Sequence, residues 1–185
     1  MFRLSLLALG GAVVLLIVLS LLPARTRTVP GGTIVLSGAQ VTLYPQADPE
    51  AVWTFAAERV DYQPDLGETV LRGIGDSART VGGEVDFTLA SERITIDAEE
   101  NLRGEHIEVY VPDVEWTLDM RAGGGETVLL DQQQGRFVVP AIDITDGSGD
   151  SISSSKNFSM NFDLTDTRTG GAGTKNSDSF RDRAD

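Results

Sequence analysis

The groups that could do chemistry in this 185-residue chain begin with a single histidine, His106. The chain has no cysteine, which excludes a cysteine nucleophile, a cysteine-ligated zinc site and a disulfide. A lone imidazole could act as a general base, but no serine–histidine–aspartate spacing accompanies it. His106 lies in the segment Arg-Gly-Glu-His-Ile, and we expect it to be a surface histidine at the start of a strand.

Three aspartates form the next candidate site: Asp143, Asp146 and Asp150 surround Gly147 and Gly149. Carboxylates at a tight turn can bind calcium, but this spacing does not match an EF-hand loop and the closing glutamate is missing. We expect a solvated loop here, with weak divalent-ion binding as the alternative.

Glutamates that could form an acid–base pair occur at Glu58, Glu92, Glu99 and Glu100. Nothing in the sequence places two of them at the separation that glycoside hydrolysis requires. No phosphate loop, nucleotide-binding fingerprint or nucleophile elbow is present. We therefore predict a protein that is not an enzyme, with no catalytic residues, no metal site and no cofactor.

The charge of the chain limits its partners. The formal net charge is −13, and residues 1–27 contain three arginines and no acid, so all 28 acidic residues lie beyond them. Binding of nucleic acid needs a basic surface, because the protein must neutralise phosphates. The acidic body therefore excludes nucleic acid as a partner and disfavours anionic membrane surfaces.

An uncharged apolar run extends from Leu4 to Leu22. As a helix it would be about 28 Å long, close to the hydrocarbon thickness of a bilayer. The alternative is a cleaved signal peptide, whose apolar stretch is usually about 7–15 residues long and ends at a small-residue cleavage site. Because no clear Ala-x-Ala follows, we predict an uncleaved single-pass transmembrane anchor.

The side of the membrane on which the body lies is less clear from the sequence. Arg3 lies before the apolar run and Arg25 and Arg27 lie after it, so the distribution of positive charge leaves the orientation open. An acidic, cysteine-free, strand-rich domain behind an anchor fits an extracytoplasmic location, although the lack of cysteine is also compatible with the cytosol.

Beyond Pro30-Gly31-Gly32 the hydrophobic pattern has a period of two. Short runs of alternating apolar and polar residues are separated by Gly, Pro, Asn or Asp, which is typical of strands and turns. The alternating apolar positions are Val41 and Leu43; Val85, Phe87 and Leu89; Ile94 and Ile96; Ile107, Val109 and Val111; Val114, Trp116, Leu118 and Met120; and Phe158, Met160, Phe162 and Leu164. The pattern predicts an all-β antiparallel domain with one apolar face.

One segment also fits a helix. Asp48-Pro49-Glu50 is a possible N-cap, and apolar residues then recur at helical spacing up to Val60. However, Trp53–Tyr62 (WTFAAERVDY) aligns with Phe87–Ile96 (FTLASERITI), and more loosely with Trp116–Met120. The Ile-Thr-Ile of the second copy favours a strand, so we predict strands for both copies, built from a repeated strand–turn–strand unit.

The chain is thus predicted to have three parts. Residues 1–29 are the membrane anchor, residues 30–164 are the β-domain, and residues 165–185 are a polar tail. The tail contains one aromatic residue, Phe180, and little else to bury, so we expect it to be disordered.

The anchor and the repeat together resemble the LptC/LptA (OstA-like) family, the periplasmic β-jellyroll proteins of the lipopolysaccharide transport bridge. The matching positions are Trp53, Phe55, Ala57, Glu58, Arg59, Val60, Tyr62, Thr69 and Leu71 in the first copy, and Phe87, Leu89, Ser91, Glu92, Arg93, Ile94 and Ile96 in the second. The resemblance covers residues 33–145, and the anchor favours the LptC type, because LptA is a soluble secreted protein. It implies an antiparallel β-jellyroll built from OstA-like strand repeats.

The resemblance also implies a function and a location. The protein would be a single-pass inner-membrane protein with its β-domain in the periplasm. It would accept a glycolipid from the membrane subunits of an ABC exporter and pass it to an OstA/LptA-like periplasmic protein. The acyl chains would lie in an apolar groove between the sheets.

The residues expected to line that groove are Trp53, Phe55, Phe87, Leu89, Trp116, Leu118 and Phe137. Plain core packing is the alternative for each of them, because groove wall and core are the same face in such a fold. The second function hypothesis is an anchored structural or adhesive β-sandwich of the cell envelope.

Overall fold

The computed structural model describes residues 33–170, which form antiparallel β-structure with no α-helix in that range. Within these residues, no helix is long and apolar enough to cross a bilayer. The predicted anchor at Leu4–Leu22 and the end of the predicted tail, residues 171–185, lie outside the described residues. The prediction of an all-β antiparallel domain is confirmed for the part that is described.

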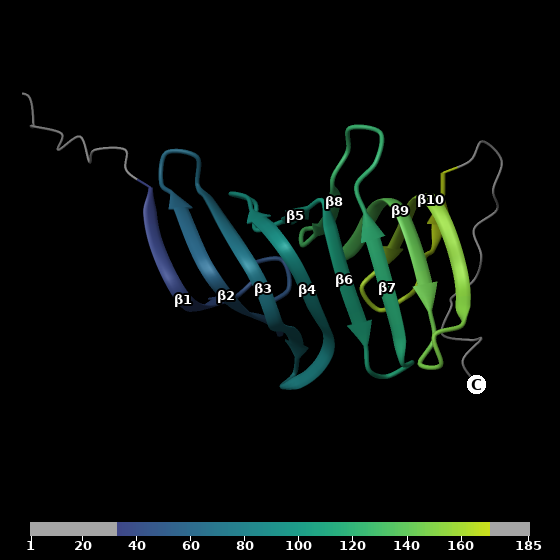
Figure 1. Ribbon diagram of the computed structural model, residues 1–185. Coiled ribbons are helices and arrows are strands. Elements are labelled where there is room, and N and C mark those ends of the chain that lie inside the picture. Colours follow the sequence, from purple (N-terminus) through teal and green to yellow (C-terminus); the bar gives the residue numbers. More distant parts are fainter. Residues whose placement is uncertain (1–32, 171–185) are drawn as a thin grey trace, which may run out of the picture. The chain divides into compact units, whose positions relative to one another are not determined.

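Eleven strands make up this part of the chain (Figure 1). They are β1 (Ile34–Leu43), β2 (Ala51–Gln63), β3 (Glu68–Val81), β4 (Glu84–Ile96), β5 (Leu102–Gly104), β6 (His106–Val111), β7 (Trp116–Arg121), β8 (Val128–Asp131), β9 (Arg136–Thr145), β10 (Ser151–Asn161) and β11 (Arg168–Thr169).

The strands β1 to β4 pair in sequence order, and the sheet then divides into two branches. The beginning of β4 pairs with β6, and its end pairs with β5. One branch runs through β5 and β8 to β9, and the other runs through β6 and β7 to β9. On its far side β9 pairs with β10, which pairs with the short β11. Figure 1 shows β1 to β4 side by side, followed by β6, β7, β9 and β10.

Bulges and one glycine allow the long strands to bend where the sheet divides. The register of β3 against β4 shifts between Ile74 and Ser77, and Asp76 there has a positive φ of 39°. A bulge bends a strand and increases its twist. Gly104, the last residue of β5, has no room for a side chain: a Cβ would lie 2.9 Å from Cγ1 of Ile107.

The two branches enclose a single hydrophobic core. Both the β5–β8 branch and the β6–β7 branch contribute fully buried side chains, among them Leu102, Leu130, Ile107, Leu118 and Met120. In these strands apolar residues alternate with exposed ones, as in β6, because successive side chains of a strand point to opposite faces. The core therefore lies where the sequence pattern put the apolar face.

The repeated segments are equivalent strands. The segment Trp53–Tyr62 lies in β2 and Phe87–Ile96 lies in β4, on either side of β3, so the choice of strand over helix is confirmed. The same repeat positions also share rows across the sheet. Trp53 and Phe87 both pair with Arg79, while Arg59 and Arg93 both pair with Arg72.

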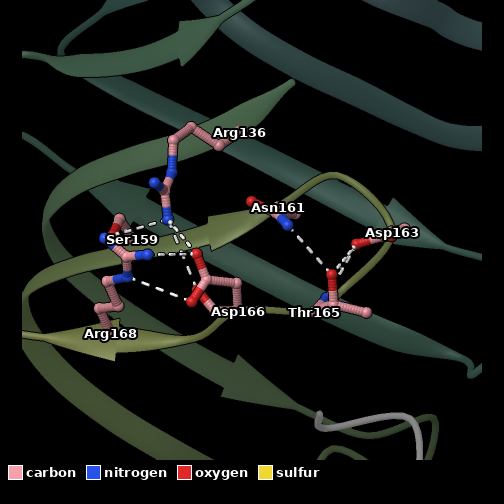
Figure 2. Close-up of polar contacts among 7 residues, drawn as sticks. All are labelled: Arg136, Ser159, Asn161, Asp163, Thr165, Asp166 and Arg168. Atoms are coloured by element: carbon pink, nitrogen blue, oxygen red, sulfur yellow. Dashed lines mark hydrogen bonds and ion pairs between the residues drawn. The ribbon is translucent and has the colours of Figure 1, made fainter. Parts of the chain in front are cut away.

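The β-domain continues beyond its predicted end at residue 164. Arg168 and Thr169 pair with β10, and the side chain of Thr167 is buried. Figure 2 shows Asp166 between Arg136 of β9 and Arg168; its Oδ2 lies 3.5 Å from Nη2 of Arg136 and 2.7 Å from Nη2 of Arg168. The first residues assigned to the tail are therefore fixed to the sheet, and the domain reaches at least Gly170.

A compact turn leads into this segment. Asn161 donates a hydrogen bond from Nδ2 to Oγ1 of Thr165 at 3.0 Å, and Asp163 accepts hydrogen bonds from the backbone N–H and hydroxyl of Thr165 (Figure 2). These local bonds reverse the chain after β10, so that β11 returns along it.

Candidate functional site

The seven residues predicted to line a groove all lie in the core. They are Trp53 and Phe55 of β2, Phe87 and Leu89 of β4, Trp116 and Leu118 of β7, and Phe137 of β9, and none is more than 5% exposed. The pattern therefore placed them on the correct face. Burial this complete is what core packing requires, and the question is where the same apolar face meets solvent.

Four of the seven residues belong to one aromatic cluster. The ring of Trp53 stacks on Phe55 with centroids 5.7 Å apart and meets the edge of Phe87 at 5.4 Å. Phe137 lies 5.4 Å from Phe87. The fifth member is Phe162, 4.8 Å from Phe137, which was predicted to be a strand residue but not part of the site. Its place in the alternating run of residues 158–164 was the signal for it.

Two hydrogen bonds link the buried side chain of Trp53 to polar groups in the core. Its Nε1 donates a 3.2 Å hydrogen bond to Oε1 of Gln132, and the backbone N–H of Gln132 donates to Oδ1 of Asn101. The Nε2 amide of Gln132 is buried with no hydrogen-bond partner among the described residues. A buried polar group costs stability unless it is hydrogen-bonded. Because the indole N–H has Gln132 as its acceptor, the hydrogen bond fixes the indole ring in one orientation.

At one margin the core is closed by a buried cation, Arg79 of β3, whose side chain is 6% exposed. Its two Nη atoms form ion pairs with Asp48 and Asp86. Its guanidinium lies 5.8 Å from the ring centre of Phe87 and 5.1 Å from that of Phe162. A cation over an aromatic face is attracted by the ring quadrupole. We call these residues, Arg79, Asp48, Asp86 and Phe162, the closed margin.

The closed margin has a hollow at its outer side. It measures about 420 Å³ and is lined by the closed-margin residues together with Val81, Gln134, Gly135, Asn161 and Asp163. Six of the nine lining residues are charged or polar, and the ion-paired Arg79 is one of them.

The apolar face is uncovered along the edge strand β1. Residues that pair across strands share a face, so Leu36, opposite Val60, and Val41, opposite Phe55, face the core side. Yet Ile34 is 54% exposed and Leu36 is 52% exposed, while Ala39, Val41 and Leu43 are half-buried. We call these five residues of β1 the open margin. It extends the core face to the edge of the sheet, because among the strands of residues 33–170 β1 pairs only with β2.

Neither the open nor the closed margin was predicted from the sequence. The apolar triplet Ile34-Val35-Leu36 was available as a signal for the open margin, but it does not alternate. Nothing in the sequence distinguishes Arg79 as a buried arginine. Its role depends on the pairing that places it between Trp53 and Phe87.

The candidates for polar chemistry lie outside the core. His106 is the first residue of β6 and is exposed, as predicted, and its Nε2 lies 2.9 Å from Oδ1 of Asp119. Asp119 also lies 3.7 Å from Arg121, which forms an ion pair with Asp143. The imidazole is thus part of a network on the outer face of β6, β7 and β9.

The aspartates of the predicted loop are divided between this network and a turn. Asp143 faces Arg121, whereas Asp146 caps the turn between β9 and β10 and accepts hydrogen bonds from Ser148 and from the backbone of Asp150. These hydrogen bonds, led by that of the Ser148 side chain, lower the pKa of Asp146. Within residues 33–170, no group of three or more His, Cys, Asp or Glu side chains is arranged to hold a metal ion.

Comparison with known proteins adds no relative, because no protein-family model and no curated protein matches the chain. The two margins of the core are therefore the features that bear on function.

Proposed function

We propose that the protein is a membrane-anchored carrier of a glycolipid of the lipopolysaccharide type, similar to LptC. In this proposal an ABC exporter in the inner membrane delivers the lipid to the periplasmic β-domain. The domain, a β-jellyroll of the LptC/LptA (OstA-like) kind, then passes it to a partner jellyroll. The observation that supports the proposal best is the open margin, where apolar side chains of the core face reach solvent at the edge strand β1.

Acyl chains fit the chemistry of the open margin. An exposed stripe that holds Ile34, Leu36, Val41 and Leu43 can cover hydrocarbon, and each methylene removed from water contributes about 0.8 kcal/mol. The polar headgroup would stay in water beside the edge. In this proposal the aromatic cluster forms the floor of the groove rather than its mouth.

The free edge of β1 supports a partner of the same kind. Its outer row of backbone N–H and C=O groups has no strand against it among the described residues. An exposed edge strand can take up a strand from another sheet. A partner jellyroll that pairs with β1 would continue the apolar stripe from one domain to the next, which gives the lipid a path.

The test is photocrosslinking during ATP-driven export, in cells that express the full chain with a photoreactive amino acid at one position. Probes at Leu36 and at Val41 should capture glycolipid. A probe at Thr42 is the matched control, because it lies in the same strand and is exposed but points to the opposite face. Absence of lipid adducts at both apolar positions, or equal capture at Thr42, would refute the proposal.

The complete burial of the seven predicted groove residues favours the second candidate, an anchored structural or adhesive β-sandwich. The two candidates differ in what a charge does at the open margin. If lipid binds there, Val41→Glu should stop export while the domain remains folded, since a carboxylate at an exposed edge can still reach water. If the domain is only structural, the same variant should leave glycolipid export unchanged.

A further inference from the structure

A row of arginines crosses the outer face of the sheet behind the open margin. Arg59 of β2, Arg72 of β3 and Arg93 of β4 are direct cross-strand neighbours. They face away from the core, because the adjacent row of Val60, Leu71 and Ile94 is buried. Neighbouring strands are about 4.8 Å apart, so the three Cα atoms span about 10 Å. We call these residues and Arg103, on the neighbouring strand β5, the arginine face.

The carboxylates of this face are not enough for its arginines. Asp61 accepts from Nε of Arg59 at 2.8 Å and from Nε of Arg72 at 3.4 Å, and Asp97 pairs with Arg103 at 3.1 Å. Among the described residues, the side chain of Arg93 has no ion pair or hydrogen bond. Like charges directly opposite each other on neighbouring strands destabilise a sheet. Two carboxylates thus form ion pairs with three of the four arginines of this face.

Guanidinium groups in a row are suited to phosphate. Each presents a planar fork of N–H donors that can bind a phosphate oxygen pair in a bidentate manner. The side chains of Arg59, Arg72 and Arg103 are between 45% and 53% exposed even though each has a carboxylate partner. Their remaining N–H groups are therefore accessible to an anion that lies over the row.

An exposed apolar side chain lies beside the row at the beginning of β1. Val35 is opposite Asp61, on the same face as the arginines, and is 47% exposed. Cationic side chains next to exposed apolar ones are the combination that binds the interface of an anionic bilayer. The connection from the predicted anchor to β1 is short. From the end of the predicted anchor at Leu22 to Ile34 the chain spans at most about 40 Å when extended.

We propose that the arginine face, with the beginning of β1, is a docking surface for anionic lipid headgroups of the membrane that holds the chain. It binds the headgroup phosphates through Arg59, Arg72, Arg93 and Arg103. This local surface is an exception to the repulsion expected from the net charge. The proposal goes beyond lipid transport and does not depend on it, because a structural domain could dock in the same way.

The test uses the full chain in vesicles of phosphatidylcholine, with or without phosphatidylglycerol. Because the natural sequence has no cysteine, a Ser37→Cys variant carries one fluorescent donor beside Arg59, its cross-strand neighbour, and a trace of headgroup-labelled lipid is the acceptor. Phosphatidylglycerol should increase energy transfer, and high salt should remove the increase, since screening shortens the reach of exposed charges.

The variant Arg93→Glu should reduce the docked population at least about fivefold, the contribution of one arginine near an anionic surface. Lys156→Glu is the matched control: it makes the same charge change at another exposed cation, on β10, and should leave the transfer unchanged. Arg93→Gln, which removes the charge without adding one, should give an intermediate loss. Circular dichroism of each variant separates loss of docking from loss of fold.

Three results would overturn the proposal. Equal transfer in both kinds of vesicle would exclude an anionic lipid as the ligand, and equal loss in Lys156→Glu would show a general effect of net charge. In the third, inorganic phosphate, titrated without vesicles at constant ionic strength, changes the donor signal only when Arg93 is present, while vesicles have no effect. That result would assign the face to a soluble phosphate compound. Photocrosslinking at Val41, which lies away from the beginning of β1, tests transport separately, so either proposal can fail while the other stands.

Discussion

The open and the closed margin belong to the same core and have opposite chemistry. At the open margin Leu36 continues the apolar face into solvent, and β1 has no strand on its other side among the described residues. At the closed margin Arg79 covers the rings of Phe87 and Phe162 and is held by two carboxylates. The chain therefore covers the aromatic rings at the closed margin with the buried, ion-paired Arg79 and leaves the open margin apolar and exposed.

The difference separates two uses of apolar surface. Around Phe162 the apolar side chains are covered, so they contribute to folding. Along β1 a similar stripe is only partly covered, so much of its apolar area stays available to a ligand or a partner. Substitutions at the two margins should consequently differ in what they affect: stability at the closed margin and binding at the open one.

The largest expected difference is between a leucine buried in the core and a leucine of the open margin. Leu164, in the turn between β10 and β11, is 1% exposed, and Leu36 is 52% exposed. Leu164→Ala should lower the free energy of unfolding by about 2–5 kcal/mol, because it leaves a cavity in a packed site. Leu36→Ala should change it by less than about 0.5 kcal/mol, as is usual for a surface position. Urea unfolding of both variants makes the comparison, and equal losses would show that the open margin is packed.

Arg79 gives the next effect. Arg79→Ala leaves Asp48 and Asp86 close together without their cation and should cost about 3 kcal/mol, at the low end for a buried pair since both carboxylates reach water. Arg121 is the matched control, because it also pairs with two aspartates but is 49% exposed, and Arg121→Ala should cost no more than about 1 kcal/mol. Thermal unfolding of the pair tests whether Arg79 closes the core. A loss as small as that of the Arg121 variant would contradict this role.

The C-terminal end of the β-domain includes residues after 164. A chain that ends there loses β11, the buried Thr167 and the two ion pairs of Asp166. We expect a loss on the order of 2 kcal/mol, since several hydrogen bonds at about 1 kcal/mol each disappear. A chain that ends at residue 170 keeps every contact described and is the control. If both truncations melt like the full chain, β11 contributes nothing to the fold.

Much of the fold could be predicted from the sequence, because apolar and polar residues alternate along a strand wherever one of its faces is buried. The runs at residues 107–111 and 116–120 became β6 and β7 with their apolar side chains inside. The similarity of the two repeat copies correctly indicated a strand rather than a helix at Trp53–Tyr62. The boundary of the tail was placed too early, because a strand of two residues shows almost no alternating pattern. In the sequence Arg168 resembles an ordinary solvent-exposed arginine, and only its pairing with β10 shows that it belongs to the sheet.

The sites were harder to predict, because they depend on register rather than on composition. Arg59, Arg72 and Arg93 are far apart in the sequence, and two of them follow a glutamate, so each was consistent with an ordinary outward residue of the repeat. Only the pairing of β2, β3 and β4 brings them into one row. Likewise, burial of the seven predicted groove residues followed from their pattern, whereas the exposure of β1 followed from its place at the edge.

The smallest expected effect on stability concerns Asp61, on the arginine face. Asp61 is buried between two arginines, and the hydrogen bond from Arg59, with a further one from Arg72, lowers its pKa below the ordinary value of 3.8. A carboxylate whose pKa is lower in the folded than in the unfolded chain stabilises the fold at pH values above its pKa in the unfolded chain. This stabilisation is lost as the pH falls through its pKa in the folded chain. Asp61→Asn should therefore be less stable than the natural chain at neutral pH, and the difference should shrink below pH 3.8.

Chemical unfolding of both proteins across this range measures the difference, and a second variant identifies its origin. Arg59→Gln removes the larger cause of the shift, so in that background Asp61→Asn should cost less at neutral pH and depend less on pH, as a double-mutant cycle would show. A difference that stays constant with pH would mean that Asp61 acts through packing alone. The arginines of that face would then carry no internal counterion that matters, and the whole row would be available to an external anion.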